Sequence, residues 1–138
     1  LGPHAAHGPE IAARVREIAG AVLYTDTAAM GDLYAGADLA VGAPGVSQFE
    51  RACCGLPSVL IAQNEMQEPL CRAWVQAGAA SAARPAAEAI AEAIDTLSSD
   101  ASRLAAISER CRRLVDGKGA ERLARALAQR VRTHRVMQ

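Results

Sequence analysis

The chain has 138 residues, of which 51% are hydrophobic, 22% charged and 3% aromatic, and its formal net charge is zero. This balance is typical of a globular chain and excludes a disordered one, and the length predicts a single domain over residues 1–138. No apolar run approaches the ~20 residues of a membrane-spanning helix, so we expect no transmembrane segment.

The net charge hides an asymmetry. Residues 101–138 carry ten Lys/Arg against three acids, a net charge of +7, and the first hundred residues carry five against twelve, a net charge of −7. A basic segment can bind nucleic acid or anionic lipid. Here the arginines are interleaved with leucines at helical spacing, which favours a solvated helix face, and the few aromatics argue against nucleic acid as a partner.

The four cysteines form no C-x-x-C pair: Cys53, Cys54, Cys71 and Cys111. Neither a zinc site nor a disulfide framework is indicated, so we expect no metal and no other cofactor. We interpret the thiols as buried structural side chains. Reduced thiols fit a cytoplasmic protein.

In chain order, residues 1–3 resemble the end of a strand whose first part precedes this sequence. Gly8-Pro9 opens a helix, because proline is favoured in a first helical turn. The apolar residues 21–24 predict a short buried strand. Asp26 or Thr27 can cap a second helix, whose inward side chains would be Met30, Leu33 and Tyr34.

The next segment alternates strands and helices. Strands are predicted at residues 37–42 and 58–62, the second continuously apolar, as in parallel strands that are covered on both faces. A short helix at residues 46–54 lies between them. A longer helix at residues 66–78 precedes a weak strand at residues 79–82, and its inward stripe is Met66, Leu70 and Trp74.

Residues 85–138 predict the helical end of the same domain. Ser98, Ser99 and Asp100 can cap the second of three helices. The three apolar stripes are Ile90, Ile94 and Leu97, then Leu104, Ile107, Cys111 and Leu114, then Leu123, Leu127 and Val131. Helices that alternate with short apolar strands predict an α/β fold, a Rossmann-like parallel sheet with helices on both faces.

Ligands of such sheets bind beyond the carboxyl ends of the strands. On that rim, Gly45-Val46-Ser47 is the first candidate, because its N–H groups lead into a helix N-terminus that favours an anion. A structural tight turn is the alternative. Glu50, about one helical turn later, can accept hydrogen bonds from ligand hydroxyls; alternatively it is an exposed acid or the capping-box partner of Ser47.

Two further groups lie in rim loops. Three amides and an acid follow the strand at residues 58–62, and they can bind a neutral sugar: Gln63, Asn64, Gln67 and Glu65. Asn64 as a helix cap is the alternative. His4 and His7 form an H-x-x-H pair with no further metal ligand nearby, so His4 is kept as a candidate ligand contact and not as a metal ligand.

No catalytic constellation is recognisable. Gly117-Lys118-Gly119 lacks the upstream glycine and the following Ser/Thr of a P-loop. There is no Ser/His/Asp order with an elbow motif and no pair of acids in a catalytic context. The residues therefore predict a binding rim, and we assign no catalytic residue.

Residues 37–67, ADLAVGAPGVSQFERACCGLPSVLIAQNEMQ, resemble the C-terminal half of GT-B-fold nucleotide-sugar proteins. They are most similar to the UDP-sugar hydrolase of pseudaminic acid biosynthesis and its spore-coat polysaccharide relatives (PseG/SpsG-like), and less closely to MurG-like glycosyltransferases. The family pattern is a strand, Gly-x-Gly-Ser-Thr, an aromatic, Glu, Gly-Leu-Pro, a strand and Asn/Gln. Residues 115–122, VDGKGAER, also resemble the hydrolase family's closing segment.

The resemblance implies binding of a UDP-sugar. Gly45-Val46-Ser47 would face the diphosphate, and Glu50 would accept the ribose hydroxyls. Tyr24 and Thr25 would border the uracil. The sugar side would be formed by Asn64, Gln67 and His4.

This sequence departs from the family at three points. Ala43-Pro44 replaces the first glycine of the turn and stiffens it, and Gln48 replaces a threonine, with loss of a hydroxyl. The family's catalytic histidine belongs to an N-terminal domain that is missing here and is the expected partner. We therefore expect one wall of a two-domain cleft, inactive alone, in a hydrolase of surface-glycan biosynthesis or alternatively a MurG-like transferase. A non-catalytic interaction module that docks through its basic region is the competing hypothesis.

Overall fold

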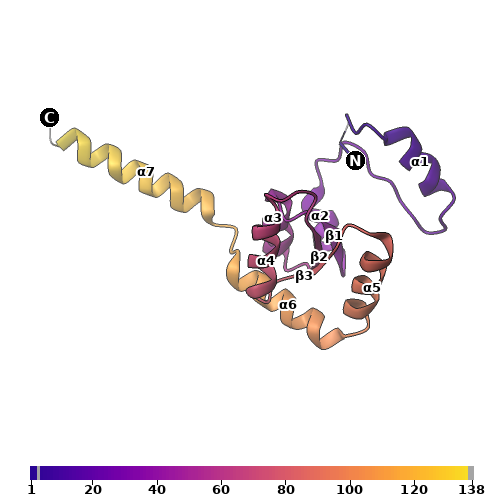
Figure 1. The fold of residues 1–138 in the computed structure, drawn as a ribbon. Helices are drawn as coiled ribbons and strands as arrows, with labels where there is room; N and C mark the ends of the chain where they lie inside the picture. The colour runs from indigo at the N-terminus through magenta and orange to yellow at the C-terminus, as the bar shows by residue number, and fades with distance from the viewer. Residues whose placement is uncertain (3, 137–138) are drawn as a thin grey trace. The chain divides into compact units, whose positions relative to one another are not determined.

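The computed structural model describes residues 1–2 and 4–136, with side chains as far as residue 131 (Figure 1). It divides into two compact units, residues 1–32 and residues 33–138. The single domain over residues 1–138 stays a prediction. Each unit is described here by itself.

The first unit contains α1 (Gly8–Arg16), which opens with Pro9 in its first turn as predicted. The strand predicted at residues 21–24 is wrong, because this segment is extended chain in which Val22 is 69% and Tyr24 50% exposed. Leu1 N donates to Tyr24 O at 2.6 Å, and Asp26 N donates to Leu1 O at 3.1 Å. These two bonds have the pattern of one parallel bridge, which is too short to make a strand of either segment.

Next comes α2 (Met30–Ala35), which begins four residues after Asp26 and three after Thr27, so neither residue is its cap. Thr27 Oγ1 accepts a hydrogen bond from Ala29 N at 3.1 Å, so it closes a turn ahead of the helix. Met30 is 38% exposed, whereas Leu33 and Tyr34 are half-buried. The inward stripe is thus confirmed at two of three positions.

A parallel sheet forms the centre of the second unit. Its strands are β1 (Ala40–Gly42), β2 (Ser58–Ile61) and β3 (Ser81–Ala83), in the order β1-β2-β3. Val41 pairs with Val59, and Leu60 pairs with Ala82. β2 is the central strand, and its first three residues are buried, which explains its continuous apolar sequence.

The helices α3 (Val46–Cys54) and α4 (Glu68–Gln76) connect these strands. They are followed by α5 (Ala87–Ser98), α6 (Ala101–Leu114) and α7 (Gly119–Val136). α4 packs on β3, α5 packs on β2 and β3, and α3 packs on α6. The predicted α/β fold with a parallel sheet flanked by helices and a helical C-terminal end is confirmed (Figure 1).

The core of the second unit joins the sheet to α3, α4, α5 and α6. Leu60 and Leu97 are fully buried, and such a side chain stabilises the fold by about 1.5–3 kcal/mol. Trp74 packs edge-on against Phe49, with ring centroids 5.1 Å apart. The other buried members are Ala52, Val59, Cys71, Ala79, Ala80, Ile107 and Cys111.

Several predicted apolar positions lie outside this core. Met66 precedes α4 and is 87% exposed, because the helix begins at Glu68 and not at residue 66. In α7, the third predicted stripe is exposed: Leu123, Leu127 and Val131. Among the described residues, no helix combines the length and the apolar character that crossing a bilayer requires.

Candidate functional site

All three strands run parallel, so their carboxyl ends meet at one edge of the sheet. β1 ends there at Gly42, β2 at Ile61 and β3 at Ala83. The connections that follow are residues 43–45, 62–67 and 84–86. This edge is where ligands of open parallel sheets bind.

After β1, the chain turns directly into α3. Gly45 is the N-cap of this helix, in an extended conformation and with no side-chain cap hydrogen bond. Ser47 is consequently the second residue of the helix, so the capping-box interpretation of Ser47 and Glu50 is wrong. A side chain built on Gly45 would meet nothing within 4 Å. The space where a side chain of residue 45 would lie is therefore open among the described residues.

The first turn of α3 contains no acidic residue. Its free N–H groups and the positive end of the helix dipole are left without a nearby carboxylate on the helix. Val46, Ser47 and Glu50 are exposed, and Gly45 is half-buried. Glu50 follows one turn along the helix. Gly45, Val46 and Ser47 thus lie at the N-terminal end of α3, and Glu50 lies at its middle.

Arg51 lies beneath this turn, and sequence reasoning missed it. Only 6% of the residue is exposed. Its Nη2 donates to Ala43 O at 2.8 Å, and its Nε donates to Gln48 Oε1 at 3.0 Å. Burial lowers the pKa of Arg51, an effect that the charges of Tyr34 and Glu50 oppose. The arginine therefore joins the end of β1 to the first turn of α3.

Gln48 is the partner of Arg51 and is fully buried. Its side chain therefore binds Arg51 in the interior and is not presented to solvent. Its Nε2 has no hydrogen-bond partner within the described structure. An unpaired buried amide of this kind is costly, which makes the arrangement unusual for a purely structural turn.

The second rim loop presents amide groups. Gln67 Oε1 accepts from Gln63 N at 3.0 Å, and Asn64 Oδ1 accepts from Gln67 N at 3.1 Å. The alternative of Asn64 as a helix cap is wrong, because Gln67 is the N-cap of α4 and Asn64 closes the turn before it. Each side-chain oxygen accepts one hydrogen bond within the loop, and neither NH₂ group has a protein partner among the described residues.

A cavity of about 420 Å³ opens beside this loop, between the ends of β2 and β3. Asn64 lines it together with four charged side chains: Glu65, Glu68, Arg72 and Arg84. Arg72 pairs with Glu68 at 3.4 Å, as exposed helix neighbours do. The position of Arg84, directly after the weak third strand, was the sequence signal that could have placed it on the rim.

The remaining predicted contacts are Tyr24, Thr25 and His4, and they belong to the first unit. Tyr24 and Thr25 are exposed, and Tyr24 O accepts from the amino terminus. His4 is exposed as well. Their roles at the uracil and the sugar stay predictions.

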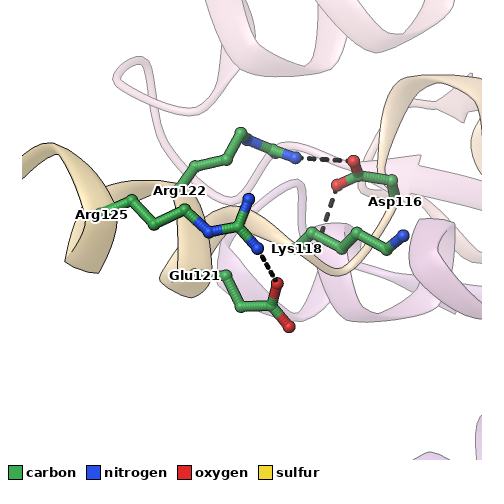
Figure 2. Close-up of polar contacts among 5 residues, drawn as sticks. All are labelled: Asp116, Lys118, Glu121, Arg122 and Arg125. Atoms are coloured by element: carbon green, nitrogen blue, oxygen red, sulfur yellow. Dashed lines mark hydrogen bonds and ion pairs between the residues drawn. The ribbon is translucent and has the colours of Figure 1, made fainter.

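The segment at residues 115–122 makes contacts at the start of α7 (Figure 2). Asp116 Oδ1 accepts from Lys118 N at 3.0 Å, and Asp116 Oδ2 accepts from Arg122 Nη1 at 2.6 Å. The Arg122 guanidinium and the Lys118 N–H lower the pKa of Asp116 to about 2. Glu121 pairs with Arg125 one turn further on. The conspicuous Asp-Gly-Lys-Gly sequence is thus an Asx-type turn with Gly117 in the left-handed region, φ 71°.

Two of the four cysteines contribute to the packing of the second unit. Cys71 and Cys111 are buried, and burial raises the pKa of both thiols. Cys53 is exposed and Cys54 half-buried, so the prediction of buried thiols is correct for two of four. Across the described residues, no three His, Cys, Asp or Glu side chains gather as metal ligands.

Comparison with solved structures finds a likeness to a glycosyltransferase. One matching structure is titled "Crystal Structure Analysis of the Glycotransferase of kitacinnamycin", and it has 21% sequence identity and a TM-score of 0.56. The match covers 79% of this chain and 30% of that chain, so this chain spans less than a third of its length. No protein-family model and no curated protein sequence matches the chain. At this identity the likeness shows the fold, which is that of a GT-B half-domain.

Proposed function

We propose that this chain binds the UDP part of a nucleotide-sugar, as one half of a two-domain GT-B enzyme. The observation that carries the proposal is the open N-terminus of α3, which has no acid in its first turn and lies at the carboxyl edge of a parallel sheet. A diphosphate supplies the negative charge that such a helix end favours. The likeness in fold to a glycosyltransferase supports the same ligand class.

Each rim residue has a role in this proposal. The N–H groups of residues 45–47 receive the diphosphate, and the exposed Glu50 carboxylate accepts hydrogen bonds from the ribose hydroxyls. The NH₂ groups of Asn64 and Gln67 donate to sugar oxygens, because their own oxygens are already bonded. For the exposed Tyr24 and Thr25 the proposed role is a contact with the uracil, and for the exposed His4 a contact with the sugar.

Glycosyl transfer is the reaction that we propose for the complete enzyme, because the structural likeness is to a glycosyltransferase. A group from the partner N-terminal domain would activate an acceptor hydroxyl, which attacks the anomeric carbon and releases UDP. The second candidate is hydrolysis, in which water replaces the acceptor. Residues 115–122 favour it through their similarity to the hydrolase family's closing segment. Either reaction would take place in the cytoplasm.

Calorimetric titration with UDP tests the binding proposal. We expect saturable binding by the folded chain, and weaker binding of uridine, which lacks the phosphates. ADP provides the control for base recognition, since it keeps the diphosphate and changes the base. Absence of UDP binding at millimolar ligand, in a sample whose circular dichroism shows it to be folded and with an N-terminal partner domain supplied, would refute the proposal.

A further inference from the structure

We propose that Arg51 is a positioning residue of the phosphate site, which fixes the turn after β1 and supplies a buried positive charge beneath it. The inference rests on the proposed diphosphate binding at the N-terminus of α3. In this proposal Arg51 does not contact the ligand. It acts on the phosphate site through the backbone of residues 42–45 and through its charge.

The positioning role follows from three contacts. Nη2 of Arg51 holds Ala43 O, and Nε holds Gln48 Oε1 in the first turn of α3. Nη1 lies against Gly42, where a Cβ atom would be only 2.5 Å away. The guanidinium thus occupies the space that any other residue at position 42 would need. The end of β1 and the start of α3 are connected through a single planar group.

Among the described residues, no carboxylate lies within ion-pair distance of the Arg51 guanidinium, and its two hydrogen-bond acceptors are neutral. Glu50 and Tyr34 act on its charge only from longer range. Arginine stays protonated even when buried. A buried charge with no carboxylate in direct contact is costly unless something compensates it. A phosphate at the open helix end above would provide that compensation.

The uncharged side chain of Gln48, which accepts a hydrogen bond from Arg51, supports the same inference. A glutamate at this position would keep the Oε1 acceptor, remove the unpaired Nε2 and give Arg51 a carboxylate partner. The chain instead carries the neutral amide of Gln48 at this position. The neutral side chain leaves the positive charge of Arg51 available to an anion outside the protein.

Gln48→Glu therefore tests the inference, because it neutralises the charge and keeps the hydrogen bond. We expect the affinities for UDP and for inorganic pyrophosphate to fall about tenfold, ~1.4 kcal/mol, and the affinity for uridine to stay unchanged. The thermal midpoint should not fall. A loss of affinity without a loss of stability is a result that a merely structural role of Arg51 would not produce.

Gln76→Glu is the matched control, since it makes the same charge change on an exposed side chain at the last residue of α4. Arg51→Lys is the second variant, which keeps the charge and loses the two-point hydrogen bonding. We expect it to weaken UDP binding more than uridine binding. Unchanged ratios of UDP to uridine affinity in both Gln48→Glu and Arg51→Lys would overturn the inference. A wild-type chain that binds pyrophosphate but not UDP overturns the nucleotide proposal alone, and one that binds neither overturns both.

Discussion

The C-terminal end of α3 gives the most quantitative prediction. Gly55 caps this helix with φ 72°, in the left-handed region, which costs other residues roughly 1–2 kcal/mol. A Cβ atom at position 55 would also lie 2.6 Å from Cζ of Arg112. Arg112 Nη2 donates to Cys54 O at 3.0 Å, and this bond anchors α6 to the end of α3.

Gly55→Ala must therefore both strain the backbone and displace the Arg112 guanidinium. The lost hydrogen bond adds about 0.5–1.5 kcal/mol to the strain, so we expect a total destabilisation of roughly 2–3 kcal/mol. The assay is urea unfolding followed by circular dichroism, with the free energy taken from the midpoint at constant slope.

Gly78→Ala is the matched control, because Gly78 has φ 67° and nothing within 4 Å of a built Cβ. It should cost only the backbone strain, about 1 kcal/mol less than Gly55→Ala. In an Arg112→Ala background the two substitutions should cost the same. Equal losses of unfolding free energy for Gly55→Ala and Gly78→Ala in the wild-type background would refute the reasoning. Arg112 would then have moved aside without a loss of stability.

Three further predictions concern the site, the core and pH. Glu50→Ala should weaken UDP binding by ~1–3 kcal/mol through lost charge-assisted hydrogen bonds, measured by calorimetry, and unchanged affinity would exclude the ribose role. Leu60→Ala should destabilise the second unit by about 2–5 kcal/mol in urea unfolding, because Leu60 is fully buried in the central strand; a cost below 1 kcal/mol would contradict that placement. The pKa of Asp116 is lowered from 3.8 to about 2, so its stabilising effect is complete above pH 3.8 and is lost as the pH falls through 2. The difference in helix content between wild type and Asp116→Asn should shrink over that interval, and a constant difference would show that the ion pair is not formed.

The regular part of the fold was predictable because local signals agreed with one another. α3 has the predicted bounds, since glycines flank an unbroken helical pattern at Gly45 and Gly55. β2 differs from its prediction by one residue, because Val59, Leu60 and Ile61 form a continuous apolar run. In these places a local pattern and the tertiary packing require the same conformation.

The strand prediction for residues 21–24 was wrong for the opposite reason. Its apolar side chains satisfy the local pattern of a strand, but a strand also needs a partner, and only Leu1 pairs with it among the described residues. Strand formation depends on pairing that a single-sequence pattern does not contain. β1 is shorter than predicted for a related reason, since its register with β2 covers only Ala40, Val41 and Gly42.

The candidate site was predictable in its exposed part and not in its buried part. Glycine, serine and an acid in a strand-turn-helix context indicate a ligand turn from sequence alone. From the sequence alone, Arg51 is one of several arginines in predicted helices. Gln48 stands out only because the resembling family has a threonine, with its hydroxyl, at that place. Only the three-dimensional placement shows that the two side chains face inward and bond to each other.

This burial changes the meaning of the departures from the family pattern. Pro44 is buried and stiffens the turn, and the carbonyl of Ala43 before it is held by Arg51. The turn therefore gains from proline and arginine the rigidity that a glycine-rich sequence does not provide, and a rigid turn loses less entropy when a ligand binds. Since Gln48 faces inward and bonds to Arg51, it acts on the buried charge beneath the helix end. We accordingly expect Pro44→Gly to weaken UDP binding by a few-fold while uridine binding stays the same, as measured by calorimetry. If Pro44→Gly lowered the affinities for UDP and uridine equally, Pro44 would affect folding and not the phosphate turn.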